Sequence, residues 1–515
     1  MKKTFIIHPF LFGLFPILFL YSYNIGELPF TEILLPSAIV LGFTAIAVTL
    51  LWLILKRDGK KSGIINSAFL VLFFSYGHLY DVIQGASIGT FIIGRHRYLM
   101  ILWAVLFILG VYFTIRTRKD LHNFTNILNI VAIVLILFSL SSIGIYKLNT
   151  GKTEKDDSAG INRQEEAYES DDQVISADAV SPDIYYIILD GYASSNTLEE
   201  VYGYDNSEFE DYLTEKDFYI AAESTSNYEM SFLSLSSSLN MEYINYLGNT
   251  LGLESDDRTI PHQMIEDNKV MKLLKSIGYQ YIHFSSGWGP TNQNQYADMN
   301  IAISRSSWND FQTLLIQTTM VDAFIKKFFQ DVGRNRVFNT FSGLAKIHEI
   351  EGKKFIFSHI VCPHPPYLFN QDGGPVPEAE FNMDEWGPEQ KEYYLNQLIY
   401  VNKEVKELVS EILSKSEIPP IIILQADHGP RNTFIEGRYP TDDMFREGMR
   451  IFYALYMPQE RYDLLYDSIT PVNTFRVIFN SFFNMDYELL DDRSYNSFEV
   501  EPYRFKDITD IVDYD

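Results

Sequence analysis

The chain contains one cysteine, Cys362, among its 515 residues. A single cysteine excludes an intramolecular disulfide, so non-covalent packing has to stabilise the fold. A chain of this length can bury enough apolar surface without covalent cross-links. We expect Cys362 to be a small buried residue of the core.

Positive charge is scarce after residue 146. This part of the chain carries 62 of the 67 Asp and Glu residues but only 30 of the 41 Lys and Arg residues. An acidic domain repels nucleic acid, and no basic stripe is present that could follow a phosphate backbone. We therefore expect no nucleic-acid partner.

The first 146 residues, by contrast, are mostly apolar. They contain five apolar stretches, most of them close to the ~20 residues that a membrane-spanning helix needs. The stretches cover residues 8–24, 33–55, 62–80, 98–115 and 124–146. We predict an N-terminal bundle of about five transmembrane helices.

Basic residues between these stretches predict the orientation in the membrane. They precede the first stretch, separate the second from the third and separate the fourth from the fifth, whereas the other loops hold only Arg95 and Arg97. The three groups are Lys2 and Lys3; Lys56, Arg57, Lys60 and Lys61; and Arg116, Arg118 and Lys119. Positive charge collects on the cytoplasmic side. The N-terminus is therefore predicted to be cytoplasmic, and everything after the fifth stretch extracytoplasmic.

The rest of the chain reads as a linker followed by one α/β domain. Residues 147–180 lack periodicity and are rich in polar and acidic residues, which predicts a flexible tether. Strand-like runs then occur at 184–189, 217–222, 279–284, 354–361, 420–425 and 450–457, and helix-like stretches at 231–243, 263–276, 308–330, 385–416 and 471–483. This alternation predicts a mainly parallel central sheet flanked by helices. The predicted domains are 1–146, 147–180 and 181–515.

Two of the predicted strands deliver an aspartate at their exit. Asp190 follows the run 184–189, and Asp427 with His428 follows the run 420–425. Ligands collect outside the carboxyl ends of parallel strands. Carboxylate and imidazole are both metal ligands, so we predict one shared metal site.

A serine-rich segment supplies a candidate nucleophile. Ser231 stands where the segment 224–239 opens a predicted helix. In the first helical turn, a hydroxyl meets unpaired backbone N–H groups and the positive end of the helix dipole, which favour an alkoxide and a bound phosphate. The alternative is a helix cap, a common role for serine.

The order of these motifs resembles the sulfatase-like branch of the alkaline phosphatase superfamily. The motifs are Asp190 after a strand, Ser231-x-x-Ser234 at a helix opening, the loop Pro363-His364-Pro365-Pro366-Tyr367, and Ala426-Asp427-His428-Gly429. With the membrane anchor, the chain looks most like lipoteichoic acid synthases and lipid A phosphoethanolamine transferases. The resemblance implies an alkaline-phosphatase-like domain. It also implies that Asp190, Ser231, Asp427 and His428 surround one divalent metal ion, Mn²⁺, Mg²⁺ or Zn²⁺.

The resemblance also implies roles for individual residues. Ser231 would attack the phosphorus of a lipid head group and form a covalent intermediate. His364 would contact the transferred group and could protonate the leaving oxygen. Further candidates for substrate contacts are His359, Arg431 and Trp288. Each of these residues also has a non-functional interpretation. His359 could have a structural role next to the strand, Arg431 could be a solvated surface residue, and Trp288 could pack in the core or a loop.

The chain departs from the family pattern at several points. The lipid head-group transferases typically have Glu at the position of Asp190 and Thr at the position of Ser231, whereas Asp at the first position looks more like sulfatases and nucleotide pyrophosphatases. The sulfatase motif, Cys or Ser followed by x-Pro-x-Arg, is absent. No Asp-x-x-x-His pattern for a second metal is evident, so we expect one ion.

These features predict a multi-pass enzyme of the bacterial plasma membrane. It would move a phosphate-linked head group, phosphoglycerol or phosphoethanolamine in type, from a membrane lipid to an envelope glycan or glycolipid. One alternative keeps the site but uses water as the acceptor, giving a phosphodiesterase, phosphatase or sulfuric-ester hydrolase. Another is a non-catalytic sensor or assembly protein, because fold alone does not settle function.

Overall fold

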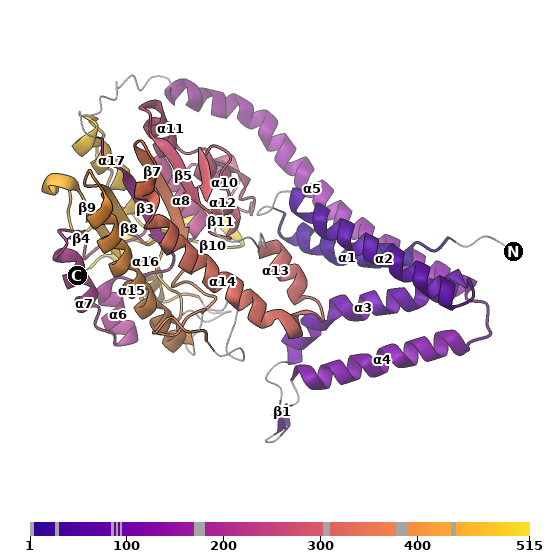
Figure 1. Cartoon of the computed structure of the whole chain (residues 1–515). Helices are drawn as coiled ribbons and strands as arrows, with labels where there is room; N and C mark the ends of the chain where they lie inside the picture. The colour runs from indigo at the N-terminus through magenta and orange to yellow at the C-terminus, as the bar shows by residue number, and fades with distance from the viewer. Residues whose placement is uncertain are drawn as a thin grey trace. The chain divides into compact units, whose positions relative to one another are not determined.

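In a computed structural model, the chain forms two compact units. The structure describes residues 5–25, 30–83, 87–88, 91–92, 95–168, 181–301, 310–376, 390–433 and 439–514. Unit 1 comprises Met1–Asp156 and Trp308–Phe329, and unit 2 comprises Asp157–Ser307 and Gln330–Asp515. Figure 1 labels many of the elements of both units.

Unit 1 is built from apolar helices. All five predicted stretches are helical, and four of them are long and apolar enough to cross a membrane: Phe30–Ile54, Gly59–Ile83, His96–Arg116 and His122–Tyr146. His8–Tyr23 is also apolar but has only 16 residues. The elements are α1 (His8–Tyr23), η1 (Phe30–Ile33), α2 (Leu34–Ile54), α3 (Gly59–Ile83), β1 (Ser87–Ile88), β2 (Phe91–Ile92), α4 (His96–Arg116) and α5 (His122–Tyr168).

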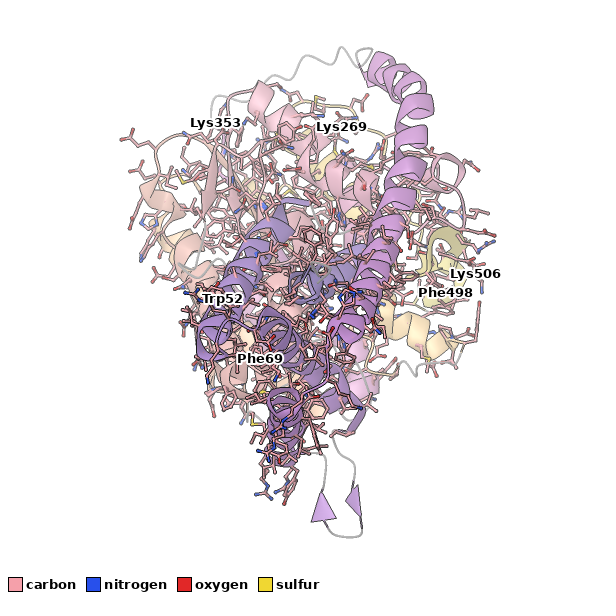
Figure 2. All side chains as sticks on the ribbon, turned by 90° about the vertical axis from the view of Figure 1, so that its right-hand side faces the viewer. Trp52, Phe69, Lys269, Lys353, Phe498 and Lys506 are labelled. Atoms are coloured by element: carbon pink, nitrogen blue, oxygen red, sulfur yellow. The ribbon has the colours of Figure 1, made fainter. Side chains whose placement is uncertain are left out.

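Aromatic side chains pack between the helices of unit 1. The ring of Phe69 on α3, labelled in Figure 2, lies 5.8 Å from Phe43 on α2 and 6.0 Å from Phe107 on α4. Many Leu, Ile and Phe side chains on α2, α4 and α5 are instead exposed. An apolar outer surface of this kind is what a lipid environment accommodates.

Two features of unit 1 differ from the predicted domain boundaries. Helix α5 runs on to Tyr168, so residues 147–168 of the predicted linker are helical, while 169–180 lie outside the described residues. The segment 147–168 has no proline and contains three Lys and three Glu residues, which favour a helix without any apolar periodicity. In addition, Trp308–Phe329 belongs to unit 1 although it lies within the predicted third domain.

Unit 2 contains a seven-stranded sheet with the order β4-β9-β8-β3-β7-β5-β6. Among these strands β9 runs antiparallel to its neighbours, and the other adjacent pairs are parallel. The predicted mainly parallel sheet is confirmed. The strands are β3 (Ile184–Leu189), β4 (Tyr219–Ile220), β5 (Gln280–Phe284), β6 (Met299–Ile301), β7 (Lys354–Ile360), β8 (Ile421–Gln425) and β9 (Tyr453–Tyr456).

Helices cover both faces of the sheet, as predicted. Alternate side chains of β3 point to opposite faces, so Ile187 belongs to one apolar cluster and Ile188 to the other. Helices α6, α7, α14 and α15 contribute to the first cluster, and α8, α11 and α17 to the second. These helices are α6 (Ser195–Tyr202), α7 (Ser207–Thr214), α8 (Ser231–Asn240), α11 (Lys269–Ser276), α14 (Asp322–Leu344), α15 (Lys391–Lys415) and α17 (Pro471–Phe482).

Several elements were not predicted or were merged. The stretch 263–276 is two helices, because Asn268 interrupts it and caps the second one by accepting a hydrogen bond from the Met271 N–H at 2.8 Å. The stretch 308–330 likewise contains a break before α14. The remaining elements are α9 (Leu247–Thr250), α10 (Thr259–Glu266), α12 (Gly289–Asn292), α13 (Asp310–Gln317), η2 (Ile347–Glu349), α16 (Asp442–Met449), η5 (Pro458–Glu460), β10 (Tyr495–Phe498), β11 (Glu501–Asp507) and α18 (Thr509–Val512).

Burial of the central strand gives a stability prediction. Replacing the fully buried Ile187 by Ala should lower the free energy of unfolding by about 2–5 kcal/mol, since the change leaves a cavity. The same substitution at Ile418, which is 45% exposed, should change it by less than about 0.5 kcal/mol. Denaturant unfolding of the detergent-solubilised chain measures both, and equal losses would contradict this account of the core.

Candidate active site

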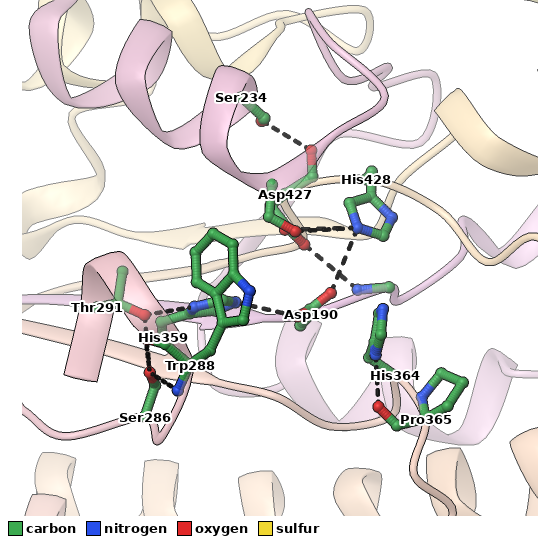
Figure 3. A network of polar contacts seen from close by, with 12 residues as sticks. Asp190, Ser234, Ser286, Trp288, Thr291, His359, His364, Pro365, Asp427 and His428 are labelled. Atoms are coloured by element: carbon green, nitrogen blue, oxygen red, sulfur yellow. Dashed lines mark hydrogen bonds and ion pairs between the residues drawn. The ribbon is translucent and has the colours of Figure 1, made fainter. Parts of the chain in front are cut away.

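Three neighbouring parallel strands, β8, β3 and β7, bring the predicted site residues to one edge of the sheet. Asp190 follows β3, Asp427 and His428 follow β8, and His359 lies near the end of β7 (Figure 3). His364 stands in the loop after β7. The carboxyl ends of parallel strands meet at one edge, and this geometry gathers residues that are 238 positions apart in sequence.

Asp190 is the centre of the site. Its backbone carbonyl accepts a hydrogen bond from the His364 N–H at 2.9 Å. Its buried carboxylate lies 3.2 Å from His359 Nε2 through Oδ2 and 3.4 Å from His428 Nε2 through Oδ1. The next residue, Gly191, has φ +71°, a conformation that glycine adopts without strain. The chain can therefore turn sharply directly behind the carboxylate.

Asp427 is fully buried beside Asp190. Its Oδ1 accepts a hydrogen bond from the Gly191 N–H at 3.3 Å, and its backbone carbonyl accepts one from Ser234 Oγ at 2.8 Å. Two residues on, Gly429 leaves no room for a side chain, because a Cβ there would lie 2.1 Å from the carbonyl oxygen of Glu447. The Asp-His-Gly turn is thus fixed by close backbone packing.

Two imidazoles present the same nitrogen toward the carboxylates. His428 Nδ1 donates to the Gly429 carbonyl at 2.7 Å, and His364 Nδ1 donates to the Pro365 carbonyl at 2.5 Å. With the proton on Nδ1, the lone pair of each Nε2 is available to a metal, and backbone carbonyls often fix metal-binding histidines in this way. The two rings lie 6.0 Å apart between centroids.

The donor set fits a divalent metal ion. Potential ligand atoms of Asp190, His364 and His428 lie within 4.8 Å of one another, as do those of Asp190, His359 and Asp427. Asp190 Oδ1 and Asp427 Oδ2 are buried and have no hydrogen-bond partner among the described residues. Buried carboxylate oxygens are rarely left in this state, and a cation would satisfy both.

Ser231 is the first residue of α8, directly after the N-cap Met230, as predicted. Its hydroxyl oxygen lies 3.2 Å from His428 Nε2. Ser234, one turn further along the same helix, is the residue that holds the Asp427 carbonyl. Helix α8 therefore supports the turn that bears Asp427 and presents the Ser231 hydroxyl to the same site.

The electrostatics favour an ionised Asp190. Burial alone would raise the pKa of this carboxyl, but the neighbouring imidazoles of His364, His359 and His428, together with the hydrogen bond from His359, lower it below its usual value. For His359, burial lowers the pKa, and the contact with Asp190 outweighs this and raises it. Asp190 is thus available as a charged ligand.

His359 and Trp288 flank Asp190 on the side of β5. His359 Nδ1 lies 2.9 Å from Thr291 Oγ1, and its other nitrogen is taken by Asp190, so both ring nitrogens are engaged within the protein. The indole of Trp288 stands at 85° to the His359 ring, 5.4 Å away between centroids (Figure 3). This arrangement orients Asp190 and agrees with the structural alternative for His359.

Arg431 contacts the loop that precedes Ser231. Its Nη2 donates to the Glu229 carbonyl at 3.0 Å, and its Nε lies 3.7 Å from the buried Glu229 carboxylate. Glu229 also accepts a short hydrogen bond from Asn496 Nδ2. The guanidinium therefore joins the loop after His428 to the loop that precedes Ser231.

Helix α15 braces two of the site loops with residues one turn apart. The Tyr394 hydroxyl donates to the Gly191 carbonyl at 3.0 Å and accepts from the Ala193 N–H at 3.1 Å. The buried Gln397 spans the His364 loop. Its amide donates to the carbonyls of Pro363, His364 and Pro366, and its oxygen accepts from the N–H groups of Leu368 and Phe369.

A second buried network joins the His364 loop to the Asp427 loop. Tyr367 donates to Asn432, which donates to the hydroxyl of Tyr202, and Tyr202 donates to Glu447 at 2.6 Å. Glu447 also accepts from the N–H and hydroxyl of Thr433. Burial raises the pKa of the Glu447 carboxyl, although these hydrogen bonds oppose the shift.

Sequence reasoning missed the residues that support the site. They are Glu229, Thr291, Tyr394, Gln397 and Glu447. One signal was available: Tyr394 and Gln397 stand three apart on the face of α15 that also buries Leu398 and Val401, and a polar residue on an apolar face needs a buried partner. The spacing of residues in the sequence does not identify the buried partners of Tyr394 and Gln397.

The brace from α15 gives a testable prediction. Replacing Gln397 by Leu should leave buried groups of residues 363–369 unpaired and lower the free energy of unfolding by about 1–3 kcal/mol. Hydrogen exchange at the Leu368 amide should become faster. Gln263→Leu, on the exposed surface of α10, is the matched control. Unchanged exchange at Leu368 would show that Gln397 does not hold the loop.

No protein-family model matches the chain, and no curated protein matches it. Solved structures are similar to it. The C-terminal periplasmic domain of EcEptC from Escherichia coli, in complex with zinc, is 12% identical with a TM-score of 0.45, covering 66% of this chain and 97% of that one. Lipooligosaccharide phosphoethanolamine transferase A, an integral membrane protein of Neisseria meningitidis, is 11% identical with a TM-score of 0.38, covering 92% and 95%. Phosphonate monoester hydrolase of Agrobacterium radiobacter is 10% identical with a TM-score of 0.38, covering 61% and 80%.

Proposed function

We propose that the protein is a membrane-anchored, metal-dependent transferase. It moves a phosphate-linked head group, phosphoglycerol or phosphoethanolamine in type, from a lipid to an envelope glycan or glycolipid. The observation that carries the proposal is the position of Ser231. Its hydroxyl stands in the first turn of a helix, 3.2 Å from an imidazole that also faces two buried carboxylates.

Asp190, Asp427, His428 and Ser231 would hold one divalent ion, Mn²⁺, Mg²⁺ or Zn²⁺. A bound divalent ion lowers the pKa of a ligating hydroxyl and neutralises charge on phosphate oxygens. The protein contributes the rigid framework, because Gly191, Gly429 and the N-terminus of α8 leave these side chains little freedom. His364 completes the inner surface of the site.

Ser231 is the nucleophile of the first step. Its Oγ loses its proton to water and forms a bond to phosphorus, while the bond between phosphorus and the lipid oxygen breaks. His364 Nε2 delivers a proton to the departing lipid alcohol. In the second step an acceptor hydroxyl gives its proton to His364 and attacks phosphorus, and the Ser231 oxygen leaves and regains a proton.

The apolar helices and the distribution of positive charge support the proposed location. We place the chain in the bacterial plasma membrane, with its N-terminus in the cytoplasm and unit 2 outside. Lipid donors are then present at high local concentration, and envelope glycans or glycolipids are the available acceptors. Nucleic acid is not a partner of this acidic domain.

Water in place of the acceptor would make the protein a hydrolase. The residue types favour this second candidate, because Asp at position 190 and Ser at position 231 depart from the Glu and Thr of typical head-group transferases. Both candidates share the first step and differ only in the molecule that resolves the intermediate.

The metal site can be tested without an activity assay. Asp427→Asn should weaken Zn²⁺ or Mn²⁺ binding by at least about 100-fold, since even changes to residues that only orient a ligand cost about 10–100-fold. Isothermal titration of the full chain in detergent measures the affinity. Asp256→Asn, on the surface, should leave it unchanged. Equal affinities in the two variants would remove Asp427 from the metal site.

The nucleophile can be tested by trapping. Incubating the metal-loaded protein with phospholipids labelled in the head group, without acceptor, should leave label on the Ser231 peptide in mass spectra. Ser231→Ala should abolish the label, whereas Ser237→Ala on the same helix should retain it. Persistent labelling of Ser231→Ala would eliminate this nucleophile.

Adding acceptor distinguishes the two candidate functions. Label that moves to a glycan or glycolipid supports transfer, and label released only as free head group supports hydrolysis. Absence of label with several head groups would count against both candidates.

A further inference from the structure

The segment from Asp310 to Ala323 packs into the apolar helices of unit 1. In sequence it lies between β6 and β7 of the sheet, yet Phe311 is fully buried and Leu315 is 7% exposed. Both belong to an apolar cluster with residues from the helices of unit 1. Those residues are Ile17, Tyr21, Ile33, Leu70, Phe74 and Ile143.

The backbone of the segment is bonded to α3. The Gly77 N–H donates to the Thr318 carbonyl, and the Met320 N–H donates to the Phe73 carbonyl, each at 3.0 Å. A Cβ at Gly77 would lie 1.9 Å from the Gln317 carbonyl oxygen, so only glycine permits this approach. The main chains of the segment and of α3 are therefore in direct contact.

The end of the segment extends the interface. Met320 and Ala323 pack against a cluster of Tyr76, Leu99 and Trp103. Main-chain hydrogen bonds gain strength where water is excluded, and apolar side chains add to them. Three kinds of observation thus agree: buried apolar anchors, paired backbone groups and a glycine that accommodates them.

We propose that residues 310–323, which belong to unit 1, hold the C-terminal part of the chain to the membrane helices in addition to the linker. The segment binds to the surface formed by α1 and α3, and this surface is specific for residues 310–323 of the same chain. A chain cut in the linker then stays assembled, because the second attachment holds the C-terminal fragment non-covalently. This proposal is independent of the proposed function.

The experiment uses the full chain in detergent with an affinity tag at the N-terminus. A specific protease site is introduced between residues 169 and 180, and the linker is cut to completion. The fragment that begins after the cut should be recovered with the tagged N-terminal fragment. Its loss from the tagged material in the unmutated protein would overturn the proposal.

Variants on both sides of the interface make the result specific. After cutting, two variants should each reduce the recovered fragment by at least about tenfold. Gly77→Leu blocks the approach of the Gln317 carbonyl. The double variant Phe311→Ala and Leu315→Ala removes two buried side chains, and one buried Phe or Leu changes an association constant by about that order. Gly110→Leu in α4, where a Cβ would meet nothing within 4 Å, is the matched control and should leave recovery unchanged.

The alanine double variant still tests the interface if Gly77→Leu causes unit 1 to misfold. Thermal unfolding of each uncut variant checks that both units are intact. Full recovery of the fragment in the alanine variant would also overturn the proposal, since another contact would then hold the fragment.

Discussion

Two buried carboxylates, Asp190 and Asp427, are the constraint on which the rest of the site depends. Each leaves one oxygen without a hydrogen-bond partner among the described residues, at a place from which water is largely excluded. Uncompensated buried charge is costly, so positive charge has to be supplied nearby. The contact with His359 supplies part of it, and a divalent cation would supply the remainder. Hydrogen bonds from Nδ1 to backbone carbonyls turn Nε2 of His428 and His364 toward these carboxylates.

The surrounding fold converts that electrostatic requirement into fixed geometry. The backbone of α15 lies outside the site, but Tyr394 holds the turn behind Asp190 and Gln397 holds the loop that bears His364. The network from Tyr367 to Glu447 joins that loop to the one that follows His428. Because these partners are buried and hydrogen-bonded, the polar groups they hold have few alternative positions. Such rigidity is what the proposed transfer through a covalent intermediate needs.

The membrane unit adds a different kind of constraint. Its helices are long and apolar enough to span a bilayer, and its interior accepts a segment that comes from between two strands of the sheet. The close approach at Gly77 shows that this contact is built at the main chain and does not depend on side-chain packing alone. Anchor and α/β domain are therefore interleaved in sequence.

The sequence by itself determined the apolar anchor, the mainly parallel sheet and the residues at its carboxyl edge, because hydropathy and strand exits are local properties of the chain. Asp190, Asp427 and His428 were identifiable as residues at strand exits, and Ser231 as the first residue of a predicted helix. Only the tertiary structure decided that His359 is engaged by Asp190 and Thr291, that Arg431 pairs with Glu229, and that Gln397 braces His364. It also decided that residues 308–329 join the anchor and that α5 extends to Tyr168. Most of these depend on contacts between residues far apart in sequence, which no local pattern encodes.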